Sequence, residues 1–283
     1  PVKGPSEGGT FVVVSGSGFS QRSSILSYLY CRFNVTRVVA SYVSMEEVHC
    51  TAPIGVTGYV GVEVSNNDAE YTESGVQFEY EEVLLVSVDP SRGVMSGGTE
   101  LTVVGEHLHA GGSKGLYCKF GVSLMQPATW QSTSSIRCAS PSYGDGGMVE
   151  LVVINNEAVY KSVLVWTYYE DPVVYGIYPV VGGVSGGTVV QVFGVGFLGS
   201  FGTYCRFGEI SVPARWSSDT LMECASPGVD GGGEVYVEVS MNNQQYGSLG
   251  SGSFEYQEMA EVEFVYPVKG PSEGGTFVVV SGS

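Results

Sequence analysis

Apolar and polar positions alternate in short stretches along most of this chain, which predicts strands that bury one face. The alternation is clearest in hairpins around Asn66-Asn67, Asn155-Asn156 and Asn242-Asn243. β-branched stretches at residues 11–14, 101–104 and 189–192 each follow a Gly-Gly-Thr turn. Glycine, proline and asparagine separate the stretches, and no helical period of apolar residues competes with them. The pattern predicts an all-β protein made of β-sandwiches.

The pattern repeats along the chain at two length scales. Residues 1–17 reappear unchanged as residues 267–283, and the Gly-Gly-Thr turn recurs at residues 8–10, 97–99, 186–188 and 274–276. Self-similarity of this length indicates a tandem array of structural units. We expect a first sandwich at 1–81 whose first strand is missing, further sandwiches at 82–170 and 171–258, and at 259–283 the first strands of a fourth unit. For this tail we favour continuation of the array, and the alternative is that it completes a neighbouring copy by strand addition.

Each unit follows one order of elements. An apolar lead-in strand ends at a proline, which cannot donate to a neighbouring strand, at Pro90, Pro179 and Pro267. A later strand carries Tyr-Cys-x-Phe, which places the cysteine and the phenylalanine on one face. A second cysteine then stands three residues before a proline, an Asn-Asn hairpin follows, and an aromatic strand closes the unit. This regular order predicts that the units share one fold.

Two cysteines fall in every unit. Six cysteines leave several pairings open, and one bond within each unit is the simplest. A zinc site is disfavoured, because no unit has a close cysteine pair or a histidine at ligand spacing. Closing a loop of about 20 residues stabilises a domain by about 3 kcal/mol, and such bonds imply an oxidising compartment. The expected pairs are Cys31–Cys50, Cys118–Cys138 and Cys205–Cys224.

One further motif indicates the secretory route. Asn34 begins the tripeptide Asn-Val-Thr, which is an acceptor for N-linked glycans when it lies on the surface of a secreted protein. The alternative is an unmodified asparagine in a loop close to Cys31. We expect Asn34 to carry a glycan.

Charge and hydropathy exclude two classes of function. The chain has 29 acidic and 12 basic residues, a formal charge of −17, so its surface repels nucleic acid. No apolar run approaches the roughly 20 residues of a membrane-spanning helix, so we expect no membrane span in this segment.

The sequence shows no pattern typical of an active site. His107 and His109 would share one face of a strand, but Glu106 would point to the other face, so we favour surface polar residues over a metal site. Glycine-rich segments at 16–18 and 194–196 lack the lysine of a phosphate-binding loop. We expect no catalytic residue, no cofactor and no metal, and therefore no enzyme.

Taken together, these motifs resemble those of the IPT/TIG family of immunoglobulin-like domains. The resemblance rests on the Gly-Gly-Thr turn, the pairs Gly18-Phe19 and Gly196-Phe197, Cys-x-Phe, Cys-x-x-Pro, Asn-Asn and the closing aromatic strand. The second unit departs from it at residues 106–108, where Gly-Phe is lost, and at Trp166 in its last strand. The resemblance implies a binding or spacer module without catalysis of its own.

The short linkers and the repeat lead to a functional prediction. We expect the sandwiches to form a semi-rigid rod, because only a few residues separate them. A fibre can reuse one contact at every step, so we expect a structural subunit of an extracellular or cell-surface filament, with copies of itself and glycans as partners. The alternative is the ectodomain of an adhesin or receptor that binds a protein or a glycan.

Overall fold

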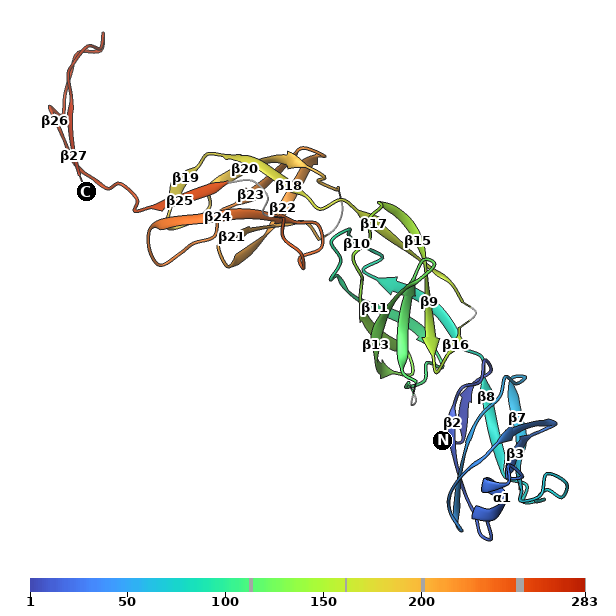
Figure 1. The fold of residues 1–283 in the computed structure, drawn as a ribbon. Helices are drawn as coiled ribbons and strands as arrows, with labels where there is room; N and C mark the ends of the chain where they lie inside the picture. Colours follow the sequence, from blue (N-terminus) through green and yellow to red (C-terminus); the bar gives the residue numbers. More distant parts are fainter. Residues whose placement is uncertain (112–113, 161, 200–201, 248–251, 283) are drawn as a thin grey trace. The chain divides into compact units, whose positions relative to one another are not determined.

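The computed structural model describes residues 1–111, 114–160, 162–199, 202–247 and 252–282. They form two compact units, Pro1–Glu170 and Asp171–Ser283. Along the colour gradient of Figure 1, the first unit contains two β-sandwiches and the second contains one sandwich followed by a pair of strands. The all-β prediction is confirmed.

The first sandwich packs two sheets around a core. One sheet has the order β1-β8-β7-β3-β4 and the other has the order β2-β6-β5. Its strands are β1 Lys3–Pro5, β2 Phe11–Ser15, β3 Tyr30–Phe33, β4 Thr36–Val39, β5 Ser41–Ser44, β6 Glu47–Thr51, β7 Gly58–Ser65 and β8 Gln77–Glu81. The core between the sheets contains Cys31, Phe33, Val48 and Phe78.

A short helix, α1, spans Gln21–Ile25 in this sandwich, where the alternation predicts no helix. The Ser20 hydroxyl caps it by accepting a hydrogen bond from the Ser23 backbone N–H at 3.3 Å. One turn with a serine cap has too few residues to show a helical period in the sequence. Among the described residues, no helix has the length or the apolar character needed to cross a bilayer.

The second sandwich is one folded sheet of nine strands. Eight follow the order β10-β17-β15-β12-β13-β14-β11-β9, and β16 pairs with β15. The strands are β9 Leu84–Asp89, β10 Arg92–Val94, β11 Glu100–Glu106, β12 Leu116–Phe120, β13 Leu124–Ser132, β14 Ser135–Ala139, β15 Gly147–Asn155, β16 Ala158–Val159 and β17 Leu164–Tyr169. The long β13 pairs with β12 through its first half and with β14 through its second, and so joins the two layers.

The third sandwich repeats this plan with eight strands in the order β18-β20-β23-β22-β21-β24-β25-β19. They are β18 Val173–Tyr178, β19 Val181–Gly183, β20 Val189–Val195, β21 Tyr204–Phe207, β22 Ile210–Ser218, β23 Leu221–Ala225, β24 Gly233–Ser240 and β25 Ser253–Gln257. Later in the chain, β26 (Val262–Tyr266) pairs with β27 (Val279–Gly282) and with no other described strand.

The core residues repeat from one sandwich to the next. Cys118 and Phe120 alternate with half-buried neighbours on β12, and both are fully buried. The phenylalanine packs edge to face on an aromatic residue of the closing strand, with ring centroids 5.4–5.7 Å apart in the three sandwiches. In the second sandwich, Trp166 occupies the position that Phe78 and Phe254 occupy in the other two.

Candidate functional site: the junction between the first two sandwiches

His107 and His109 lie on the loop that follows β11. His107 has a positive φ of 56°, and the strand ends at Glu106. The two histidine rings therefore do not lie on one face of a strand. The His107 side chain is half exposed and the His109 side chain is 17% exposed. The sequence favours a surface position for both histidines. His107 has such a position, whereas His109 lies largely buried against the first sandwich.

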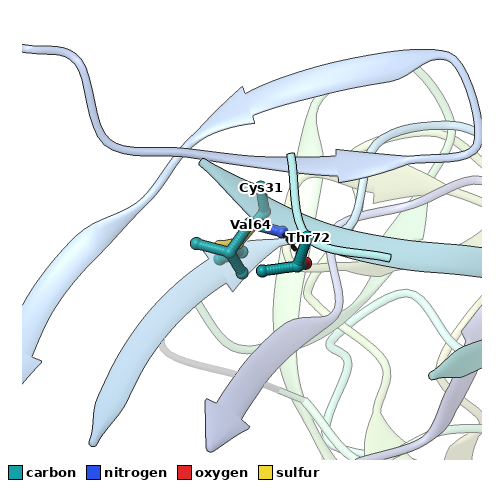
Figure 2. Close-up of a disulfide and its surroundings, with 4 residues drawn as sticks. Cys31, Val64 and Thr72 are labelled. Atoms are coloured by element: carbon teal, nitrogen blue, oxygen red, sulfur yellow. Dashed lines mark hydrogen bonds between the residues drawn. A yellow bond between two sulfur atoms is a disulfide. The ribbon is translucent and has the colours of Figure 1, made fainter. Parts of the chain in front are cut away.

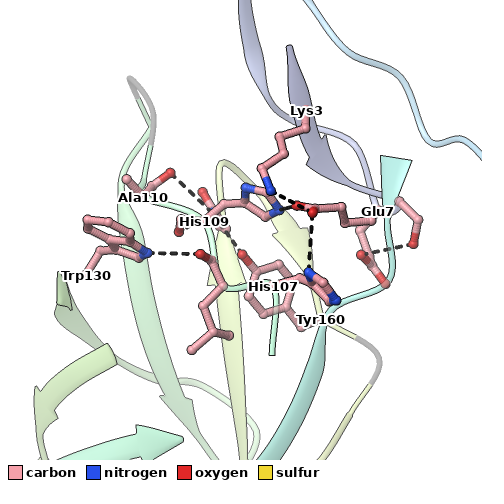
Figure 3. Close-up of polar contacts among 11 residues, drawn as sticks. Lys3, Glu7, His107, His109, Ala110, Trp130 and Tyr160 are labelled. Carbon is pink, nitrogen blue, oxygen red and sulfur yellow. Dashed lines mark hydrogen bonds and ion pairs between the residues drawn. The ribbon is translucent and has the colours of Figure 1, made fainter. Parts of the chain in front are cut away.

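The group that brings them together is Glu81, the last residue of β8. Its Oε1 lies 2.8 Å from Lys3 Nζ and 3.3 Å from His107 Nδ1, and its Oε2 lies 3.1 Å from His109 Nε2 (Figure 3). The Glu81 side chain is only 10% exposed. A carboxylate of the first sandwich is therefore held between a lysine of its own domain and two imidazoles of the next.

The electrostatics of this cluster follow from burial and charge. Burial by itself raises the pKa of Glu81, but the hydrogen bond and charge of Lys3, aided by both histidines, bring that pKa below its ordinary value. Burial lowers the pKa of His109, an effect that the Glu81 carboxylate opposes without cancelling. At neutral pH the contact therefore joins a carboxylate to a neutral imidazole.

The loop that carries His109 is fixed by the second sandwich. Asn155 Nδ2 donates to the His109 carbonyl oxygen at 3.0 Å and to the Tyr160 hydroxyl at 2.9 Å. Trp130 Nε1 donates to the Leu108 carbonyl oxygen at 3.0 Å (Figure 3). Because these contacts hold the loop backbone, the imidazole is placed against the first sandwich at little further cost in entropy.

The linker at this junction is equally constrained. Only Glu82 and Val83 separate β8 from β9, and Val83 is buried in the core of the second sandwich. A cavity of about 300 Å³ between the two sandwiches is lined by Lys3, Phe11, His109 and the turn at Asn155. The junction is thus held by the buried Val83 side chain and by the contact of Glu81 with His109.

The chemistry that this cluster shows is an ionic contact. Among the described residues, no group of three or more His, Cys, Asp or Glu side chains is arranged to hold a metal ion. Sequence reasoning missed Glu81, because it belongs to the preceding unit and lies far from the histidines in the chain. The one signal available was an acidic linker, Glu81-Glu82, ahead of a unit whose Gly-Phe pair is replaced by a histidine loop.

The other residues singled out in the sequence lie inside the sandwiches or on their turns. The sulfur atoms are joined as Cys31–Cys50, Cys118–Cys138 and Cys205–Cys224, with each bond linking the two layers of one sandwich. Figure 2 shows the first bond beside Val64, whose backbone N–H donates to Thr72 Oγ1 at 3.0 Å. Asn34 is exposed in the turn between β3 and β4, with a positive φ of 54°.

Comparison with known proteins decides the family. The IPT/TIG domain model matches this chain three times, at residues 1–80, 84–168 and 172–256. The chain belongs to the IPT/TIG family. The matches place the Glu81 cluster at the boundary between its first and second IPT domains.

Relatives of these IPT domains occur in large animal proteins. Human Plexin-A4 is 32% identical over 203 residues, which is 69% of this chain and 10% of the relative. Mouse Fibrocystin-L is 26% identical over 295 residues, which is 100% of this chain and 6% of the relative. The chain therefore spans about a tenth or less of the length of these two relatives.

A solved structure agrees with the IPT fold. The full extracellular region of plexin A4 superposes with a TM-score of 0.64 at 22% identity, over 96% of this chain and 26% of that one. Disulfides persist in oxidising compartments, in keeping with the relationship to an extracellular region. These IPT domains form an extracellular segment.

Proposed function

We propose that this segment is part of the ectodomain of a receptor-type surface protein, where its IPT domains act as a spacer and present surfaces for a protein or glycan ligand. One observation carries the proposal: the largely buried Glu81 side chain lies between the first two domains and contacts groups of both. Such a contact restricts hinge motion, and a spacer needs that restriction. The relationship to Plexin-A4 and Fibrocystin-L supports the ectodomain assignment.

Distance measurement between the two domains tests the spacer. Spin labels at Val35→Cys and Val122→Cys occupy exposed turns, 84% and 92% exposed, one on each domain. We expect one narrow distance distribution in the otherwise unaltered chain and a broader one after Glu81→Ala. A broad distribution before that substitution would contradict a fixed junction.

A filament is the second candidate function, and a specific observation favours it. Residues 1–17 and 267–283 are identical, although the copies of the unit between them have diverged. Selection for one repeated contact along a fibre explains such identity, whereas a receptor has little need for it. Electron microscopy of the native material separates the two candidates: an axial repeat supports the filament, and isolated particles support the ectodomain.

A further inference from the structure

An open apolar groove lies beside Asn34 on the first domain. It has a volume of about 290 Å³, and its lining includes Asn34 itself together with Val35, Ile54 and Val56. These three apolar side chains, called the Asn34 groove below, are 84%, 79% and 84% exposed in that order. Apolar side chains that are exposed next to one another on an extracellular domain indicate a surface that another group covers.

The apolar character of this groove is specific to the first domain. The backbone N–H groups of Gly55, Tyr143 and Val229 make the same hydrogen bond in the three domains, to the carbonyl oxygens of residues 6, 95 and 184. The residues that flank Gly55 in the first domain are both large and apolar. Their counterparts are small or polar, namely Ser142 and Gly144 in the second domain and Gly228 and Asp230 in the third.

The second domain covers the corresponding surface with a side chain of its own. Tyr143 stacks on Tyr168, with ring centroids 4.9 Å apart and ring planes at 20°. The first domain has no room for such a side chain, because a Cβ at Gly55 would lie 2.4 Å from the Tyr80 ring. Its groove is therefore open to a group that the backbone at Gly55 does not carry.

The glycan acceptor occurs in the same domain as the groove. Asn34, Gly121 and Gly208 directly follow Cys-x-Phe in the three domains and share a left-handed backbone, with φ values of 54°, 58° and 59°. Among these three turns, all of which the structure describes, only the first has an acceptor tripeptide, since the others read Gly-Val-Ser and Gly-Glu-Ile. The acceptor and the apolar groove therefore accompany each other.

We propose that the Asn34 groove binds the first N-acetylglucosamine of a glycan carried by Asn34. One face of the sugar ring consists of C–H groups and its N-acetyl group ends in a methyl, so both cover apolar side chains while the hydroxyls stay in water. Attachment forms the bond from Asn34 Nδ2 to the sugar C1, breaks the bond from C1 to the diphosphate of a lipid-linked oligosaccharide and releases an amide proton. The proposal rests on glycosylation of Asn34 and does not depend on the spacer role.

Trimming of the glycan tests the contact. An endoglycosidase that cuts between the first two sugars leaves a single N-acetylglucosamine on Asn34, and Thr36→Ala gives a chain without a glycan. Thr36→Ser, which keeps the acceptor, controls for the change in the strand. Mass spectrometry establishes the glycan on each form of the full chain, and hydrogen exchange of peptides from β3 and β7 measures the stability of the first domain.

We expect exchange in β3 and β7 to be equally slow in the intact and the trimmed chain, because one sugar is enough to cover the groove. Exchange in Thr36→Ala should be faster by about fivefold or more. A trimmed chain that exchanges as fast as Thr36→Ala would overturn the proposal. So would a chain from a secretory host that carries no glycan on Asn34, because the groove would then lack its occupant.

Substitutions in the groove separate its contribution from that of the glycan as a whole. Ile54→Ser and Val56→Ser together remove two of the apolar side chains that the sugar covers. In the trimmed chain we expect them to abolish the slower exchange, and in the Thr36→Ala background to change exchange little, because there both side chains face water. Equal effects in the two backgrounds would overturn the proposal.

An acceptor transferred to the second domain provides the matched control. Gly121→Asn completes Asn-Val-Ser at the equivalent turn, where asparagine tolerates the left-handed backbone and the nearest atoms to a Cβ, those of Val149, lie at 3.8 Å. We expect its glycan to leave exchange in β12 and β15 unchanged relative to Gly121→Asn combined with Ser123→Ala, because Ser142 and Gly144 form no apolar groove. Equal slowing in the second domain would reveal a general effect of glycans and overturn the proposal.

Discussion

Glu81 Oε2 lies 3.1 Å from His109 Nε2, across the boundary between the first two IPT domains. The carboxylate closes the last strand of one domain, and the imidazole belongs to a loop that the next domain holds in place. The contact is short, largely buried and formed by titratable groups, so it makes the stability of the junction depend on pH.

Acidification is expected to weaken this junction. The pKa of His109 is lowered in the folded protein, so the unfolded chain binds the proton more readily, and stability is lost as the pH falls below about 6.5. The pKa of Glu81 is also lowered, which adds a second loss as the pH falls below about 4.5. Calorimetric unfolding temperatures at stepped pH measure both losses.

A histidine variant isolates the first loss. In His109→Gln, the fall in unfolding temperature between pH 7 and pH 5 should be smaller than in the unaltered chain. His107→Gln, which removes the half-exposed ring, is the matched control. Identical pH profiles for the unaltered chain and His109→Gln would contradict this account of the junction.

A tyrosine hydrogen bond should stabilise the second domain and not the third. The Tyr168 hydroxyl donates to the Pro141 carbonyl oxygen at 3.0 Å, while Tyr256 occupies the same position in the third domain and its hydroxyl meets no acceptor among the described residues. Tyr168→Phe should cost about 1 kcal/mol, since it removes a buried hydrogen bond. Tyr256→Phe should be neutral or slightly stabilising, as chemical denaturation of the two variants can show. A larger loss for Tyr256→Phe would reverse the expected order.

Each disulfide should contribute strongly to its own domain. Cys118 and Cys138 lie 20 residues apart, and both are buried. Replacing both by alanine should lower the free energy of unfolding of the second domain by about 3 kcal/mol, because the unfolded chain gains entropy. Denaturation followed by tryptophan fluorescence in a Trp216→Phe background reports on this domain, because the other two tryptophans, Trp130 and Trp166, belong to it. A change below about 1 kcal/mol would show that packing alone holds it together.

Glycosylation at Asn34 remains a prediction with a direct test. The side chain is exposed on a turn. Expression through a secretory pathway should therefore add the mass of a glycan that is lost in Asn34→Gln. Thr36→Ala should lose the same mass, because it destroys the acceptor motif and keeps the asparagine. An unchanged mass in both variants would leave Asn34 unmodified.

The sequence predicts the elements that depend on local alternation. The Tyr-Cys-x-Phe segments lie on β3, β12 and β21, and the β-branched stretches lie on β2, β11 and β20, because burial of one strand face requires a period of two. Strand limits set by tertiary pairing were harder to foresee. The long β13 of the second domain corresponds to two separate strands, β4 and β5, in the first.

The junction could not be read from the sequence for a physical reason. Glu81 meets His107 and His109 across a domain boundary, two residues before Val83 enters the core of the second domain. Alternation reports which face of a strand is buried and carries no information on how one domain meets the next. The expected rod, the fourth unit and the filament rest on the repeat and stay predictions.

The most direct test of the proposed ectodomain is antibody labelling of intact native cells, with gold-conjugated antibody against this segment viewed by electron microscopy. The account predicts labelling of unpermeabilised cells at a constant distance from the membrane, as separate particles. Label that requires permeabilisation, or that follows fibres with a regular axial spacing, would contradict it.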